Sequence, residues 1–365
     1  MNETTPKRIL SLDGGGLRGV ASIAFLERLE AKLQADYGRP IALHEHFDLI
    51  GGTSTGSIIA TGLALGQPLS EIKDHYFRLA PNVFRRAWNR IPLVHAIFSA
   101  EALQREFLGI VGDRTLATPD LKTGLAIITK RVDTGAVWFL TNNAGAPYWD
   151  DPEDGSFIGN RHYSLANVIR ASTAAPHFFD PHLIEIVKGK TTGLFVDGGV
   201  SPHNNPALAL LQIATVPAYG YNWPAGGNRL EITSVGTGSF RYLVDRKTFA
   251  SRFAASRAID ALRSMMADND AMVLTVMQTL GRCQTPWSIN TEIGNLCGVC
   301  IAPEPLFTFR RYDLVLEQPW LKDMLGVDIS ARDLARLRDI TSLSTMETIY
   351  SMAAAAADKQ MPSHI

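Results

Sequence analysis

Three short segments carry residue types that could together hydrolyse an ester. Gly52 to Gly56 (GTSTG) matches G-x-S-x-G, a sharp strand-to-helix turn that exposes a serine hydroxyl as a nucleophile. Asp197, which follows another apolar run and precedes Gly198 and Gly199, could act as the general base. The segment from Asp13 to Gly19 (DGGGLRG) offers bare backbone N–H groups to developing negative charge. The set amounts to a nucleophile, a base and an oxyanion hole.

A steric argument explains why glycines flank Ser54. Side chains at Gly52 and Gly56 would collide with adjacent backbone, because the turn holds the serine in a strained conformation. Such five-residue matches also arise by chance, but an apolar strand before and an apolar helix after are the context that the motif requires. A phosphate-binding loop is excluded, since Ser57 occupies the position of its lysine.

The glycine run allows two interpretations. Gly14, Gly16 and Gly19 also satisfy G-x-G-x-x-G of dinucleotide-binding folds, with Asp36 at about the right distance but in a helix-end or loop setting. As an oxyanion hole, adjacent glycines let N–H groups converge on one oxygen, and losing one such donor costs about 3 kcal/mol. Arg18 could brace this loop or attract an anionic head group, and a solvated helix cation is the alternative.

No histidine lies in an obviously catalytic frame, although nine are present. Histidine is the usual base of serine hydrolases. Asp197 is better placed, because a strand-end aspartate beside two glycines can approach Ser54 directly. A purely structural aspartate that accepts N–H groups of a turn remains the alternative.

Composition narrows the classes of protein. The 365 residues are 46% hydrophobic and 19% charged, which favours a packed soluble fold over disorder. The net charge of −1 gives no overall field for a nucleic acid polymer. The N-terminus lacks the pattern of a signal peptide and no apolar run is long enough to span a membrane, so we expect a cytoplasmic protein that could visit a membrane surface. Cys283, Cys297 and Cys300 lack a fourth ligand, which argues against zinc.

Alternating strands and helices predict an α/β fold with a parallel or mostly parallel sheet covered on both faces. The predicted strands are 8–12, 47–50, 124–132, 136–141, 193–196 and 229–235. The predicted helices are 20–33, 55–65, 207–213 and 256–280, with a helical end over 328–359 and surface loops at 142–160 and 216–228. Neither a repeat nor a long linker divides the chain, so we expect one compact domain.

The motifs resemble those of the patatin-like phospholipase family. The segments 13–19, 52–56 and 197–199 resemble its oxyanion-hole motif, its nucleophile elbow and its catalytic Asp-Gly-Gly. Two further segments, 171–176 (ASTAAP) and 204–206 (NNP), resemble stretches before and after the aspartate. The five segments occur in the family's order, which makes the match specific.

This resemblance implies a Ser–Asp dyad on a three-layer α/β/α fold, with the serine on a strand-turn-helix elbow and with neither a metal nor a cofactor. Ser54 would attack a phospholipid or other lipid acyl ester, Asp197 would be the general base, and the N–H groups of Gly14, Gly15 and Gly16 would hold the oxyanion. Supporting positions are Arg18, Gly52, Gly56, Gly198 and Gly199. The catalytic core would span 8–208, and 209–365, which resembles the family only weakly, would complete the same domain.

Residues 77–98 combine arginines with aromatic and aliphatic side chains, which suits a membrane interface or a lid over an acyl channel. An ordinary packed helix pair with solvated arginines is the alternative. Met265, Met266, Met272 and Met277 recur at near-helical spacing, which is more typical of a core than of an acyl channel.

Two alternatives concern regulation and loss of chemistry. Bacterial relatives in this family include cyclic-nucleotide-activated effectors of antiphage (antiviral) defence, so the resemblance leaves open a cyclic nucleotide activator and a homo-oligomer. A nucleotide- or partner-binding module that kept the fold without the chemistry is the remaining alternative.

Overall fold

The computed structural model describes residues 5–84, 96–243, 254–296 and 298–361. The strands are β1 Lys7–Leu12, β2 Leu49–Thr53, β3 Gly124–Arg131, β4 Ala136–Thr141, β5 His182–Val187, β6 Thr191–Asp197, β7 Leu230–Val235, β8 Arg282–Cys283 and β9 Thr308–Tyr312. The helices are α1 Gly19–Tyr37, α2 Leu43–His46, α3 Thr55–Ala64, α4 Leu69–Val83, α5 Ala100–Val111, α6 Leu165–Ser172, α7 Ala207–Thr215, α9 Ala254–Leu280, α10 Gln318–Trp320, α11 Ala331–Arg338 and α12 Met346–Gln360.

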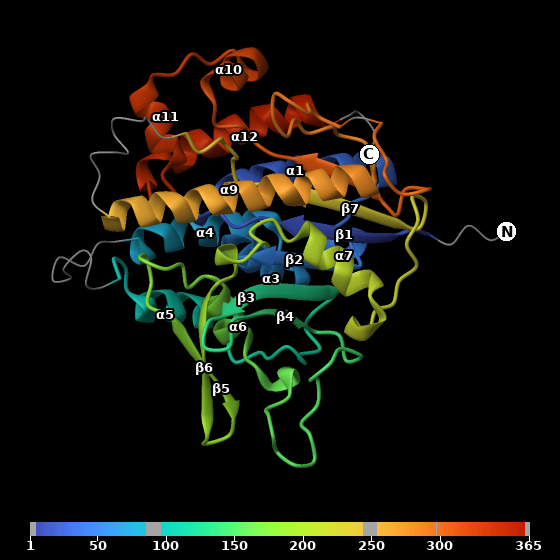
Figure 1. Ribbon diagram of the computed structural model, residues 1–365, viewed down its shortest axis with the longest axis vertical. Coiled ribbons are helices and arrows are strands. Elements are labelled where there is room, and N and C mark those ends of the chain that lie inside the picture. The colour runs from blue at the N-terminus through green and yellow to red at the C-terminus, as the bar shows by residue number, and fades with distance from the viewer. Residues whose placement is uncertain (1–4, 85–95, 244–253, 297, 362–365) are drawn as a thin grey trace.

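All of these strands join one sheet in the order β5-β6-β3-β2-β1-β7-β9-β8, with β4 also paired to β3. The pairings from β3 through β2, β1, β7 and β9 to β8 are parallel, whereas β4, β5 and β6 pair antiparallel. The prediction of a mostly parallel sheet is therefore confirmed. The added antiparallel hairpin β5–β6 projects from the lower edge of the molecule in Figure 1.

Helices cover both faces of the sheet, because alternate side chains of each strand enter different cores. On β1, Leu10 and Leu12 belong to the core under α1, α3, α4, α5, α6 and α12, while Ile9 belongs to the core under α7 and α9. Figure 1 shows α9 crossing in front of the sheet. The result is the three-layer α/β/α arrangement that the sequence analysis expected.

The ends of β2 and β6 meet head-on. Strand β3 pairs with β4 along one edge over Ala126–Arg131, so its other partners must share the opposite edge. There β2 runs parallel to β3 until Thr53 faces Ile128, and β6 runs antiparallel to β3 until Asp197 faces Thr129. The two carboxyl ends therefore point toward each other at neighbouring positions of β3, which brings Ser54 and Asp197 together.

The structure extends the predicted elements in two ways. Strand β2 continues to Thr53 rather than ending at residue 50, because ladder partners on β1 and β3 hold its glycines extended. The C-terminal part supplies β8 and β9, which the sequence analysis missed, as it did β5. The ladder fixes β9 against β7, whereas its sequence TFRRY mixes apolar and charged residues. Of the helices in the described ranges, none is long and apolar enough to cross a membrane.

Candidate active site

Ser54 lies at the turn between β2 and α3 with φ of 53° and ψ of −123°. Positive φ is strained for a residue with a side chain and costs on the order of 1–3 kcal/mol. A Cβ on Gly52 would lie 2.2 Å from the carbonyl carbon of Gly56, and a Cβ on Gly56 would lie 2.2 Å from the carbonyl oxygen of Leu12. Both glycines therefore permit a close backbone crossing, as the steric argument from the sequence required.

Side chains from other segments hold this turn. The Ser54 N–H donates to Ser172 Oγ at 2.9 Å, and the Ser172 hydroxyl donates to Ile128 O at 2.6 Å. The Thr53 hydroxyl donates to His203 O at 2.6 Å. Ser172 belongs to the segment 171–176 that the family resemblance singled out, so that segment supports the strained serine.

The Ser54 hydroxyl donates to Asp197 Oδ2 at 2.6 Å. The other carboxylate oxygen accepts the Gly199 N–H at 2.7 Å, which fixes the plane of the carboxyl group. A Cβ on Gly198 would lie 2.4 Å from Ile128 O, so the chain can turn at this point only with glycine. The predicted encounter between the serine and the aspartate is thus present.

Burial raises the pKa of Asp197 to about 6, although the Ser54 hydroxyl, the Gly199 N–H and the charge of Arg170 act in the opposite direction. The Arg170 guanidinium is buried and donates to Asp180 O at 2.7 Å. A carboxylate with a pKa nearer neutrality is a stronger base than an ordinary aspartate, and it is still mostly ionised at pH 7.

The glycine loop lies beside the serine, but one of its expected donors is occupied. The Gly14 N–H donates to Asn204 O at 3.1 Å, so the prediction that it holds the oxyanion is wrong for this arrangement. Within the described ranges, the N–H groups of Gly15 and Gly16 donate no hydrogen bond. Gly16 adopts φ of +57°, which suits glycine, and starts a short 3₁₀ turn.

A further donor was not foreseen. Thr55 is the first residue of α3, and its N–H likewise has no acceptor in the part of the chain that the structure describes. The residue after the nucleophile supplies an oxyanion donor in other elbow-type hydrolases. The N–H groups of Gly15, Gly16 and Thr55 are therefore the candidate oxyanion donors, and all three residues line the same cavity as Ser54.

The model for patatin-like phospholipases matches residues 10–211, more than half of the chain. This chain belongs to the patatin-like phospholipase family. The family assignment predicted from the five motifs is confirmed, and with it membership in a family of hydrolases.

Relatives come from bacteria and from plants. The chain is 30% identical over 212 residues to a cGAMP-activated phospholipase of Escherichia coli (strain TW11681), which covers 56% of this chain and 55% of that protein. It is 29% identical over 261 residues to a cGAMP-activated phospholipase of Vibrio cholerae serotype O1, with 67% and 68% covered. It is 26% identical over 249 residues to patatin group M-1 of Solanum tuberosum, with 63% and 60% covered. The match thus spans little more than half the length of the E. coli relative.

In this patatin-like chain, a cavity of about 1910 Å³ opens beside Ser54. One wall is apolar and comprises Ile58, Leu79, Phe84, Phe98, Phe178 and Phe179. Phe84 and Phe98 belong to the 77–98 region for which a lid or acyl channel was considered; residues 85–95 of that region lie outside the described residues. Phe84 and Phe98 line the cavity and also pack against the core, as the acyl channel and the packed helix pair would each require.

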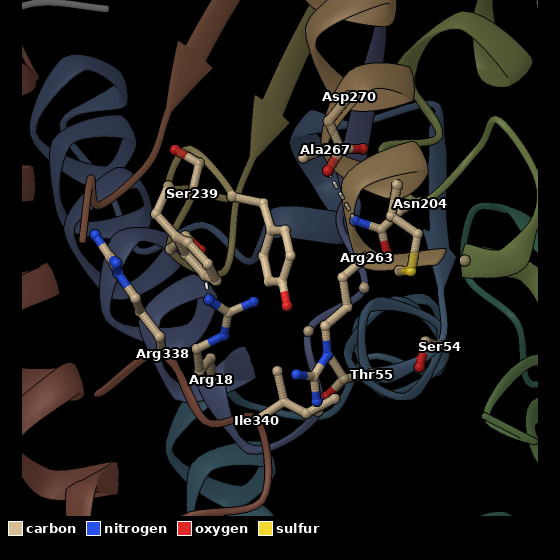
Figure 2. A pocket seen from close by; sticks show the side chains of 18 of the residues that line it. Arg18, Ser54, Thr55, Asn204, Ser239, Arg263, Ala267, Asp270, Arg338 and Ile340 are labelled. Atoms are coloured by element: carbon tan, nitrogen blue, oxygen red, sulfur yellow. Dashed lines mark hydrogen bonds between the residues drawn. The ribbon is translucent and has the colours of Figure 1, made fainter. Parts of the chain in front are cut away.

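The lining of the cavity also includes charged side chains. Figure 2 shows Arg18 and Arg263 extending into it from different elements, with Ser54 at its margin. Arg18 is only 9% exposed, so its interpretation as a solvated helix cation is wrong. Its Nη1 donates to Gly238 O at 2.8 Å, as the bracing interpretation expects, and burial lowers its pKa to about 10.

The methionine prediction for α9 is only partly right. Met277 is fully buried, but Met265 is 62% and Met272 is 47% exposed. Met266 lines the cavity near Gly199 instead of filling a core. Helical spacing alone did not separate these environments, because one face of α9 covers the sheet and another borders the cavity.

Among the residues that the structure describes, neither a histidine nor a metal cluster joins the serine and the aspartate. Among described hydrogen bonds, those of Ser54 Oγ and Asp197 include no histidine ring, although the exposed His177 lines the same cavity. In the described ranges, no three His, Cys, Asp or Glu side chains gather as metal ligands. Asp36, the acidic residue of the dinucleotide alternative, lies near the end of α1 rather than at a strand end.

Sequence reasoning missed a buried charge cluster behind the glycine loop. Arg311 on β9 donates at 2.7 Å to both Asp13 and Asp313. Asn204 Nδ2 donates to Asp270 of α9 at 3.1 Å, while Asn204 O holds Gly14. The only hint of this cluster in the sequence was Asp13, which comes directly after a predicted strand. Its partner lies 298 residues away, and no local pattern in the sequence pointed to it.

Proposed function

We propose that this protein is a lipid acyl hydrolase that cleaves acyl esters of phospholipids. Ser54 is the nucleophile and Asp197 the general base. The observation that carries the proposal is the 2.6 Å hydrogen bond from the Ser54 hydroxyl to Asp197, made at a strained turn. Proximity of this kind activates a hydroxyl that is otherwise a weak nucleophile.

The reaction proceeds in two halves. Ser54 Oγ attacks the ester carbonyl carbon while its proton passes to Asp197, and the carbonyl oxygen becomes an oxyanion held by N–H groups of Gly15 and Gly16. Asp197 returns the proton to the departing alcohol, which leaves an acyl-serine. A water that gives its proton to Asp197 then attacks the acyl-serine, and the free fatty acid departs as Ser54 regains its hydroxyl.

The cavity supports a lipid as the substrate. Its apolar wall, which includes Ile58 and Phe98, suits an acyl chain, since burying each methylene contributes about 0.8 kcal/mol. The guanidinium of Arg18, which also lines the cavity, suits an anionic head group. Because phospholipids reside in bilayers, the proposed activity requires contact with a membrane surface.

A second candidate is the same hydrolase under the control of a cyclic nucleotide. The observation that favours it comes from the names of three bacterial relatives. Two of them are cGAMP-activated phospholipases, and a third, from E. coli, is a cUMP-AMP-activated phospholipase. In this case the isolated protein would be idle until the nucleotide is added, and an assembly of several copies would accompany activation.

Removal of either reacting group tests the proposal. Ser54→Ala and Asp197→Ala should each lower fatty acid release from phospholipid vesicles by at least about 1,000-fold, measured by mass spectrometry. Surface changes of the same kinds, Ser344→Ala and Asp150→Ala, are matched controls and should leave release unchanged, because both side chains are exposed.

Labelling by a fluorophosphonate separates the enzyme from a non-catalytic binding module. The wild-type protein should become labelled at Ser54 and the Ser54→Ala variant should not. Full activity in either the Ser54 or the Asp197 variant, with correct folding by circular dichroism, would refute the dyad.

A further inference from the structure

Tyr76 of α4 joins the two halves of the candidate site. Its side chain is buried and borders the cavity. The Tyr76 hydroxyl donates a short hydrogen bond to Gly16 O on the glycine loop. It also lies 2.5 Å from Thr55 Oγ1, the side chain that directly follows Ser54. One hydroxyl group therefore touches the segment proposed to hold the oxyanion and the segment that carries the nucleophile.

The number of available protons fixes which group donates in each of these two hydrogen bonds. A tyrosine hydroxyl has one proton, and here it goes to the Gly16 carbonyl, which can only accept. The Thr55 hydroxyl must then donate to Tyr76 Oη. Burial raises the pKa of Tyr76, so the phenol keeps its proton throughout the pH range in which the protein would work.

Glycine makes room for this junction. A Cβ on Gly19 would lie 2.6 Å from both Tyr76 Oη and Thr55 Oγ1. The last glycine of the DGGGLRG segment is thus required by the tyrosine rather than by the oxyanion. Gly16 itself adopts φ of +57°, which glycine reaches without strain, so it is support from outside the loop that keeps it in this one conformation. Tyr76 supplies that support on the carbonyl side, and the Leu17 N–H supplies more by donating to Ile340 O at 2.8 Å.

We propose that Tyr76 is a positioning residue that sets the distance between the oxyanion donors of the glycine loop and Ser54. This inference rests on the proposed function. Its physical basis is that donors stabilise an oxyanion only when they are already aimed at it, because a loop that must reorganise loses most of the benefit. A role in packing alone would depend on the ring and not on the hydroxyl.

Tyr76→Phe removes only the hydroxyl and tests this role. We expect kcat for fatty acid release to fall about 10- to 100-fold with KM changed less than about twofold, since removal of a whole oxyanion donor costs about 100- to 1,000-fold. Affinity for a trifluoromethyl ketone that forms an oxyanion on Ser54 should fall by a similar factor. Affinity for a non-hydrolysable ether phospholipid should remain unchanged.

Tyr312→Phe is the matched control. Tyr312 is also fully buried, but its hydroxyl has no hydrogen-bond partner within the described residues, and it does not line the cavity. This variant should keep the kcat of the wild type and its affinity for the trifluoromethyl ketone. A loss of activity that is equal in both variants would assign the Tyr76 effect to general loss of packing and overturn the proposal.

A second pair of variants covers the case in which Tyr76→Phe fails to fold. Thr55→Val should weaken binding of the trifluoromethyl ketone in the same direction, and Thr55→Ser, which keeps the hydroxyl, should restore it. Wild-type affinity and kcat in Tyr76→Phe, or in Thr55→Val if the former cannot be purified, would overturn the positioning role alone. A wild-type protein that neither releases fatty acid nor is labelled at Ser54 would instead overturn the proposed function.

Discussion

At the scale of single residues, the environment of Asp197 decides what its carboxyl group can do. The side chain is 5% exposed, and the loss of hydration raises its pKa to about 6. The folded state then holds this proton more tightly than the unfolded chain, whose aspartates titrate near 3.8. Its contribution to folding stability is fully present below about pH 4 and is lost as the pH rises through 6. The same shift makes the carboxylate a better base.

The pH dependence of the reaction follows from this pKa. In the proposed mechanism Asp197 must be ionised to accept the proton of Ser54, so kcat/KM should rise tenfold per pH unit below about pH 6 and level off above about pH 7. Steady-state rates of fatty acid release between pH 4.5 and 8.5 would measure the profile. A profile that stays flat down to pH 4.5 would argue against a base with this raised pKa.

Asp13 and Asp270 complicate this profile, because burial raises the pKa of Asp13 to about 7 and that of Asp270 to about 6. The variant Asp270→Asn serves as the control. It should keep the acidic limb of the profile, because Asp270 does not contact Ser54 in the structure.

At the scale of elements, the close crossing of β2 with the start of α3 gives the serine its exposure. The crossing is possible because Gly52 and Gly56 have no side chains. A Cβ at either position would lie too close to the neighbouring backbone. The head-on meeting of β2 and β6 along one edge of β3 then supplies the aspartate. Function at this scale depends on backbone geometry, so it should be sensitive to a single methyl group.

Gly52→Ala tests that sensitivity. The added Cβ would lie 2.2 Å from the backbone of Gly56, so the turn must shift; we expect a loss of stability of about 1–3 kcal/mol and a loss of kcat of at least about 100-fold. Thermal unfolding and fatty acid release measure the two effects. The control is Gly109→Ala on α5, where a Cβ meets nothing within 4 Å and should stabilise the helix by up to about 1 kcal/mol. Normal activity in Gly52→Ala would contradict the steric account of the turn.

At the scale of the whole molecule, the N-terminal and C-terminal parts share one sheet and one cavity. Strands β7, β9 and β8 extend the sheet beyond β1, and Arg311 on β9 ties into the end of β1 through Asp13. The cavity beside Ser54 is also lined by residues far beyond the region that matches the family, such as Arg263 and Arg338. A ligand that contacts Arg263 or Arg338 would therefore lie in the same cavity as Ser54.

Addition of cyclic dinucleotides tests regulation at this scale. If this protein is activated in the way that the names of its bacterial relatives describe, cGAMP or cUMP-AMP at micromolar concentration should raise fatty acid release at least about tenfold, with an increase in particle size by light scattering. Linear dinucleotides of the same bases are the control and should have no effect. High activity that does not change with any cyclic dinucleotide would leave the unregulated hydrolase as the proposed function.

Prediction from the sequence was strongest where a short local pattern requires one particular local structure. The strained serine, its flanking glycines and the strand-end aspartate could be identified because each needs a particular residue type at a particular place. Prediction failed for Gly14, because its N–H is taken by a carbonyl 190 residues later in the chain. It was incomplete for Arg18, whose burial depends on segments around Gly238 and Phe240.

The sequence by itself determined the class of chemistry and the α/β character of the fold, since these follow from residue types and from hydrophobic periodicity along short segments. Only the tertiary structure decided which donors remain free, which charges are buried and how Tyr76 and Arg311 hold the glycine loop. The physical reason is that hydrogen bonding and desolvation depend on neighbours in space, and these neighbours come from strands and helices that are distant in the chain.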